Sequence, residues 1–143
     1  MRGIDARQRD LIQDVVNEGL SPYSISALEK DLHLGFILDR LRLSHAELPG
    51  LVLCGGTSLV KGHKLIARMS EDMDFKVAIS SDFSTNKRSS FLSSLKGQIT
   101  TLLAEDGFVG ENVSAHNQNS FFSIELRYSP AFLIEAALRP HIL

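Results

Sequence analysis

Residues 51–58 read LVLCGGTS and residues 72–79 read DMDFKVAI, and these two stretches predict neighbouring strands of one sheet. The apolar run at residues 51–54 predicts a short strand that is buried on both faces and ends at Gly55 and Gly56. Thr57 or Ser58 is expected to cap a short helix after the glycines. In the second stretch apolar residues alternate with other residues, which predicts a half-buried strand.

Helices are predicted on both sides of these strands. Apolar residues recur with helical spacing in residues 6–18, 24–43 and 91–103. The helix at residues 24–43 carries apolar residues on two opposite sides, which is typical of a helix packed between two neighbours. Gly107 is expected to end the last of these helices.

More strands are predicted in the last third of the chain. Residues 108–116 and 120–128 predict an antiparallel pair, and residues 139–143 predict the beginning of another strand. Helices and strands in this mixed order indicate an α/β or α+β fold, in which flanking helices pack on a mixed β-sheet.

Length and composition restrict the class of protein. The chain has 143 residues, which predicts a single domain over residues 1–143, with N-terminal helices at 1–48 and the sheet core at 49–143. Its net charge of −2 excludes a global basic field that would attract nucleic acid from a distance. A single cysteine, Cys54, cannot form an internal disulfide. Because the sequence also lacks a membrane-spanning run and an apolar signal region, we expect a cytoplasmic protein without a membrane partner.

Gly55, Gly56, Thr57 and Ser58 form a candidate phosphate site. A strand that ends in glycines and leads into hydroxyl side chains at a helix start offers accessible backbone N–H groups and the positive end of a helix dipole. The order of residues differs from that of a Walker loop, because Lys61 precedes the next glycine. Two adjacent glycines are also typical of a tight turn between a strand and a helix, and this alternative stays open.

Asp72 and Asp74 form a candidate metal site. Residues i and i+2 of a strand project from the same face, about 6.6 Å apart along the strand. Two such carboxylates repel each other unless a cation neutralises them, and their oxygens suit Mg²⁺ or Mn²⁺. A solvated acidic strand end would give the same pattern. Together with a phosphate site on the neighbouring strand, however, the pair favours metal-assisted nucleotidyl transfer.

These residues resemble the AbiEii-type toxin family of nucleotidyltransferases, which has the fold of DNA polymerase beta. The resemblance is carried by residues 55–61, which read GGTSLVK, and by residues 68–75, which read RMSEDMDF. Residues 28–34 look like the family's acidic-basic helix before the first strand, and residues 138–143 look like the approach to its next strand. The resemblance covers most of the chain from about Tyr23 onward.

The resemblance implies a transfer of a nucleotide from an NTP to an RNA acceptor, often the acceptor end of a tRNA. It also implies Mg²⁺ or Mn²⁺ as cofactor, a toxin–antitoxin or phage-defence system, and a cognate antitoxin as partner. Asp72 and Asp74 would be catalytic and would hold the metal. Arg68 would brace the loop or contact the substrate. The implied nucleotide-binding residues are Gly55, Gly56, Thr57, Ser58, Lys61 and Arg68.

One acid of the family pattern has no counterpart in this sequence. The third metal-site acid would fall just after Leu143, so the resemblance implies a chain that is truncated at its C-terminus. Glu125, on the strand face opposite Ile124 and Leu126, is a candidate substitute, and Glu135 is a weaker one. The helical C-terminal region of the family also has no counterpart here.

Two other function classes stay open from the sequence. A catalytically incomplete module would bind NTP or an antitoxin without turnover. In a purely structural protein, the glycine turn and the acidic strand end would be coincidental. Lys61, Lys64 and Arg68 recur at helical spacing, which fits either a basic groove for nucleotide or RNA or an ordinary solvated helix face.

Overall fold

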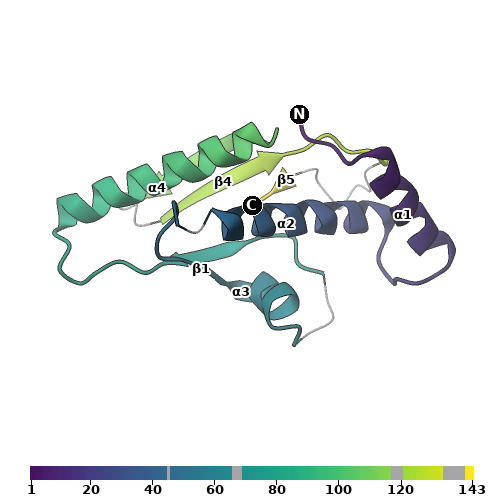
Figure 1. Cartoon of the computed structure of the whole chain (residues 1–143), viewed down its shortest axis with the longest axis horizontal. Coiled ribbons are helices and arrows are strands. Elements are labelled where there is room, and N and C mark those ends of the chain that lie inside the picture. Colours follow the sequence, from purple (N-terminus) through teal and green to yellow (C-terminus); the bar gives the residue numbers. More distant parts are fainter. Residues whose placement is uncertain (45, 66–68, 117–120, 134–140) are drawn as a thin grey trace.

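The computed structural model describes residues 1–44, 46–65, 69–116, 121–133 and 141–143, in which helices and short strands follow one another in mixed order (Figure 1). The helices are α1 (Ala6–Asn17), α2 (Ile25–Leu43), α3 (Gly55–Thr57), the π-helix η1 (Ser58–Gly62) and α4 (Thr85–Glu105). The strands are β1 (Leu51–Cys54), β2 (Asp74–Val77), β3 (Val109–His116), β4 (Phe121–Arg127) and β5 (His141–Ile142).

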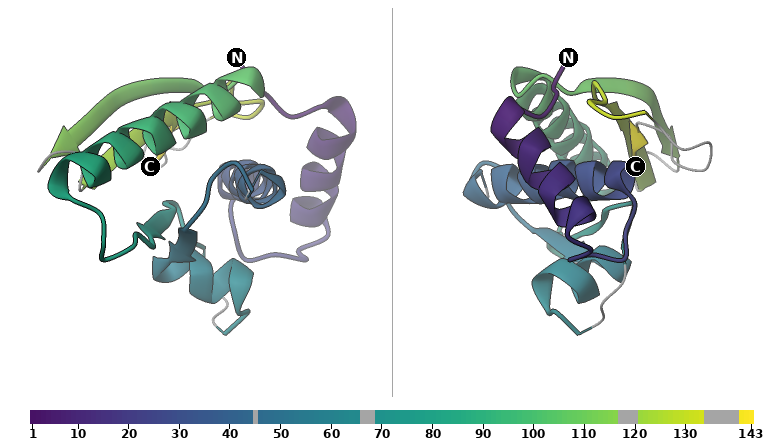
Figure 2. Two further views of the ribbon diagram at one scale, coloured as in Figure 1. Left: turned by 60° about the vertical axis from the view of Figure 1, so that its left-hand side comes forward. Right: turned by 90° about the vertical axis from the view of Figure 1, so that its right-hand side faces the viewer.

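The helix α2 lies at the centre of the molecule. Viewed nearly along its axis, α4 and the sheet of β3, β4 and β5 lie on one side of it, and β1 and α3 lie on the other (Figure 2). Its N-terminus is capped by Ser24, whose hydroxyl accepts a hydrogen bond from the Ala27 N–H at 3.3 Å. Leu34 and Ile37 are fully buried. The prediction that this helix packs between two neighbours is confirmed.

The strands form two small antiparallel sheets. β1 pairs with β2 in a register that places Cys54 opposite Asp74. In the other sheet β4 lies between β3 and β5, which confirms the predicted antiparallel pair and the final strand. The backbone N–H of Met73, just before β2, donates to the carbonyl of Leu143, just after β5, at 2.8 Å. The two sheets therefore meet near the beginning of β2.

The hydrophobic core joins α2, α4 and the inner faces of the strands. The buried residues of α4 lie on one face, as its helical spacing predicts, and Ser84 caps the helix N-terminus. On β2 the side chains of Met73, Phe75 and Val77 pack half-buried against this core. The alternation predicted for residues 72–79 is therefore confirmed, although the strand itself is shorter. The main core residues of α4 and β4 are Leu92, Leu95, Ile99, Leu102, Leu103 and Leu126.

Two local predictions were wrong. β1 is not buried on both faces, because it belongs to a sheet of two strands, and Val52 is 53% exposed. The expected capping bond from Thr57 or Ser58 is absent, since α3 begins at Gly55 with Cys54 as its N-cap, and Thr57, the N-cap residue of η1, makes no side-chain capping bond. The helix predicted at residues 6–18 is confirmed as α1, in which Ile12 is buried and Leu11 is 60% exposed.

The described elements confirm the predicted α+β fold class with flanking helices, although the described strands form two small antiparallel sheets in place of one mixed sheet. Across the described ranges, none of the helices combines the length and the apolar character needed to cross a lipid bilayer. The pairing of β1 with β2 matters most for function, because it brings the glycine turn and the acidic strand together.

Candidate functional site

Asp74 and Gly55 lie against each other where β2 begins and β1 ends. The register of the two strands sets this contact, because Asp74 lies opposite Cys54, the residue before Gly55. Gly55 has a φ of +65°, and a Cβ atom at this position would lie only 2.1 Å from Oδ2 of Asp74. The carboxylate thus occupies space that any other residue at position 55 would fill. The structure brings one predicted metal ligand next to the predicted phosphate site.

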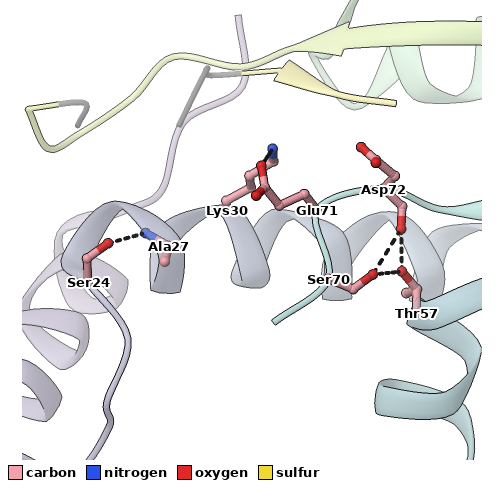
Figure 3. Close-up of polar contacts among 7 residues, drawn as sticks. All are labelled: Ser24, Ala27, Lys30, Thr57, Ser70, Glu71 and Asp72. Atoms are coloured by element: carbon pink, nitrogen blue, oxygen red, sulfur yellow. Dashed lines mark hydrogen bonds and ion pairs between the residues drawn. The ribbon is translucent and has the colours of Figure 1, made fainter. Parts of the chain in front are cut away.

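Asp72 and Asp74 lie on the exposed face of the segment that leads into β2. Both are exposed, while Met73 and Phe75 between and after them face the core, so the predicted sharing of one face is confirmed. Both also line a cavity of about 540 Å³, together with Arg88 and apolar residues of α2, α4 and β4. Figure 3 shows the Asp72 carboxylate directed away from α3.

Thr57 occupies a different environment from the one its predicted role suggests. It is 1% exposed, and its hydroxyl donates to the backbone carbonyl of Asp72. The same hydroxyl lies 2.7 Å from Oγ of Ser70 (Figure 3). The side chain of Thr57 is therefore bonded within the protein, to the segment that carries the aspartates.

A partly buried ion pair contacts the same segment from the side of α2. Nζ of Lys30 lies 2.9 Å from Oε2 of Glu71, the residue before Asp72 (Figure 3). Lys30 is 4% exposed, whereas the Glu71 side chain is half exposed. A lysine this deeply buried is rare unless a partner compensates its charge. The segment is thus fixed from α3 and from α2.

Among the predicted basic residues that the structure describes, Lys61 pairs with α2 and not with the aspartates. Nζ of Lys61 lies 2.8 Å from Oδ1 of Asp31 and donates to the backbone carbonyl of the same residue, on α2. Lys64 is exposed, and Arg68 lies outside the described residues. The structure thus places the Lys61 charge against α2.

A cluster of polar residues on α2 was missed by the sequence analysis. Glu29 and His33 are buried, and the His33 ring lies 4.3 Å from the Tyr128 ring between centroids. Burial, and to a lesser extent the charge of Arg2, lowers the pKa of His33 to about 4. Burial raises the pKa of Glu29, although its carboxylate accepts a hydrogen bond from the Ala131 N–H at 2.7 Å.

Tyr128 also belongs to this cluster of buried polar residues. The positions of the α2 members in the sequence indicate that they are buried. Burial, reinforced by the charges of Glu29 and Glu71, raises the pKa of the Tyr128 hydroxyl to about 12. On α2, Glu29 and His33 lie between the two apolar stripes of the helix, and Lys30 lies within the stripe that contains Ile37 and Leu41. Charged residues between two buried faces cannot all reach solvent, so this position alone indicates buried polar contacts.

The two aspartates fit a divalent cation that also binds substrate phosphates. Mg²⁺ typically takes one or two carboxylates from a protein and completes its shell with water and phosphate oxygens. Within the described ranges, no group of three or more His, Cys, Asp or Glu residues is placed to hold an ion. The candidate substitute Glu125 instead accepts a hydrogen bond from Asn112 on β3 at 2.6 Å. Glu125 therefore does not join the pair, and Glu135 lies outside the described residues.

Comparison with known protein families gives a match that includes this site. The family described as "Nucleotidyl transferase AbiEii toxin, Type IV TA system" matches residues 37–143. This range contains β1, the glycine turn and both aspartates. A search of curated proteins found no match to the chain, and neither did a search of solved structures.

Proposed function

The chain belongs to the AbiEii family of nucleotidyl transferase toxins of type IV toxin–antitoxin systems, and on this premise we propose that it transfers a nucleotide from an NTP to an RNA acceptor. A tRNA is the proposed acceptor, a divalent metal ion the proposed cofactor, and the cytoplasm the proposed location. The contact between Asp74 and Gly55 carries the proposal, because it places a proposed metal ligand beside a proposed phosphate-binding residue.

Asp72 and Asp74 are the proposed ligands for Mg²⁺ or Mn²⁺. Their common exposure on one face and their place in one cavity support this role. When bound, the ion would neutralise phosphate charge and lower the pKa of the attacking hydroxyl. The aspartates themselves would orient the triphosphate relative to the acceptor, because carboxylate ligands fix the direction of the remaining coordination positions.

Gly55, Gly56 and Ser58 are the proposed contacts for the polyphosphate. Glycines allow phosphate oxygens to approach the backbone N–H groups closely. Thr57 would contribute only its backbone, since its hydroxyl is bonded to Ser70 and Asp72. Lys61 can add its charge only if its ion pair with Asp31 opens.

Transfer of label from an α-³²P-labelled NTP to a tRNA pool in Mg²⁺ tests this function. We expect labelling by the wild-type chain and at least about a hundredfold less by the Asp72→Asn, Asp74→Asn double variant, since the charge that stabilises the transition state is then lost. Asp39→Asn is the matched control, because Asp39 is an exposed aspartate of α2 that pairs with Arg42. Equal labelling by the double variant and the control would contradict the proposal.

A second candidate function is NTP binding without transfer. It is favoured by the observation that the described residues hold no group of three or more His, Cys, Asp or Glu side chains placed to bind an ion. Calorimetry separates the two functions. Mg²⁺-dependent NTP binding by a chain that labels none of the RNAs supplied would favour the binding module. A cognate antitoxin is the proposed protein partner in either case, as the family description implies.

A further inference from the structure

We infer that Thr57 and Lys30 are positioning residues, which fix the Asp72 carboxylate in the orientation that metal binding requires. This inference rests on the proposed function of Asp72. It assigns to Thr57 a role distinct from phosphate binding, and it gives a role to a buried lysine that the glycine and aspartate motifs do not include.

Thr57 fixes the backbone of Asp72. Its hydroxyl donates to the Asp72 carbonyl, and Ser70 joins the same set of hydrogen bonds at 2.7 Å from the Thr57 oxygen. Thr57 is itself buried, with 1% of its surface exposed, at the junction of α3 and η1. The hydrogen bond to the Asp72 carbonyl limits rotation of the Asp72 backbone. Figure 3 shows that the carbonyl points toward Thr57 and that the Asp72 carboxylate points away from it.

Lys30 fixes the residue before Asp72. Glu71 and Asp72 are joined by one planar peptide, so a Glu71 side chain held against α2 restricts the backbone that carries Asp72. The 2.9 Å pair with Lys30 holds Glu71 in this way. The pair also compensates the negative charge of Glu71 next to two further carboxylates, which would otherwise repel them.

The two anchors act on a segment without regular secondary structure. Residues 69–73 are not part of a strand or helix, because β2 begins only at Asp74. Outside regular structure no ladder of backbone hydrogen bonds fixes the direction of a side chain. The contacts with Thr57 and Lys30 therefore replace that ladder for Asp72. Residues that orient metal ligands in this way typically contribute about 10- to 100-fold to metal affinity.

Binding of Mn²⁺ alone, followed by electron paramagnetic resonance, tests this inference without relying on turnover. Thr57→Val removes the hydroxyl and preserves the shape of the side chain, and we expect it to weaken Mn²⁺ binding at least about tenfold. Thr57→Ser keeps the hydroxyl and is expected to keep the affinity. Thr100→Val is the matched control, because the Thr100 hydroxyl bonds only to the Lys96 carbonyl of its own helix at 2.9 Å.

Three results separate the inference from the function on which it rests. If Asp72→Asn leaves Mn²⁺ binding unchanged, the metal site itself is elsewhere and the proposed function fails. If Asp72→Asn weakens binding but a folded Thr57→Val does not, the positioning role is wrong. Should Thr57→Val fail to fold, Lys30→Met replaces it, and a folded Lys30→Met with wild-type affinity overturns the inference.

Discussion

The carboxylate of Asp74 lies in the space where any residue other than glycine at position 55 would place its Cβ atom. That Cβ would lie 2.1 Å from Oδ2 of Asp74, and the φ of +65° at Gly55 is itself strained for other residues. The antiparallel pairing of β1 and β2 brings the two residues together. The glycine is therefore required both by the turn and by the position of the carboxylate.

Gly55→Ala is expected to displace the Asp74 carboxylate and to weaken Mn²⁺ binding. The left-handed backbone adds a stability cost of about 1–2 kcal/mol. Gly97→Ala provides the control, because a Cβ at Gly97 in α4 would meet no atom within 4 Å. That control should gain about 0.5–1 kcal/mol from the better helix propensity of alanine. Urea unfolding and a Mn²⁺ titration measure both effects, and wild-type affinity in folded Gly55→Ala would contradict this reading.

His33 is expected to make the fold sensitive to acid. Its pKa is lowered from 6.5 to about 4, so the unfolded chain binds a proton before the folded chain does. Above pH 6.5 His33 is neutral in both states and does not reduce the free energy of unfolding. As the pH falls from 6.5 toward 4, protonation of His33 in the unfolded chain lowers the free energy of unfolding. At pH 5 the loss should reach about 2 kcal/mol.

His33→Phe should remove this sensitivity. A phenylalanine keeps an aromatic ring beside Tyr128 and Phe108, and it needs no partner for the buried Nε2, which makes no hydrogen bond to the described residues. The stability difference between variant and wild type, measured by urea unfolding, should grow by about 2 kcal/mol in favour of the variant from pH 7.5 to pH 5. A difference that stays constant with pH would show that His33 is not the titrating group.

Asp31→Asn should release Lys61 toward the nucleotide. Asp31 and Lys61 form a 2.8 Å ion pair whose side chains are partly exposed, so its loss should cost at most about 1 kcal/mol of stability. If Lys61 is a nucleotide-binding residue, calorimetry should show NTP binding several-fold tighter in Asp31→Asn. The gain should disappear in the Asp31→Asn, Lys61→Met double variant. A gain that persists without the lysine would remove Lys61 from the nucleotide site.

Much of the fold could be predicted because local patterns determine it. The apolar face of α4 and the alternation along residues 72–79 each follow from one element and the core it faces. The burial of β1 could not be predicted in this way, since it depends on how many strands join its sheet and on what covers them. An apolar run such as residues 51–54 looks the same in a central strand and in a two-stranded sheet.

The candidate site shows the same division. Gly55 and Asp74 could be predicted as neighbours because a glycine turn and an acidic strand start were expected on adjacent strands. The role of Thr57 could not, because a hydroxyl after two glycines suits a phosphate equally well, and only the fold shows that it bonds Asp72. The pairing of Lys30 with Glu71 joins residues that are 41 positions apart, and no local pattern reports such a contact.

Cleavage of the chain by Fe²⁺ bound in place of Mg²⁺ tests most directly whether Asp72 and Asp74 hold one ion beside Gly55. With ascorbate and peroxide, the bound iron generates radicals that cut the nearest backbone, and mass spectrometry locates the cuts. We predict cuts near Gly55 and within residues 72–74, suppressed by excess Mg²⁺ and lost in the Asp72→Asn, Asp74→Asn variant. Cuts elsewhere, or the same cuts in that variant, would contradict the account.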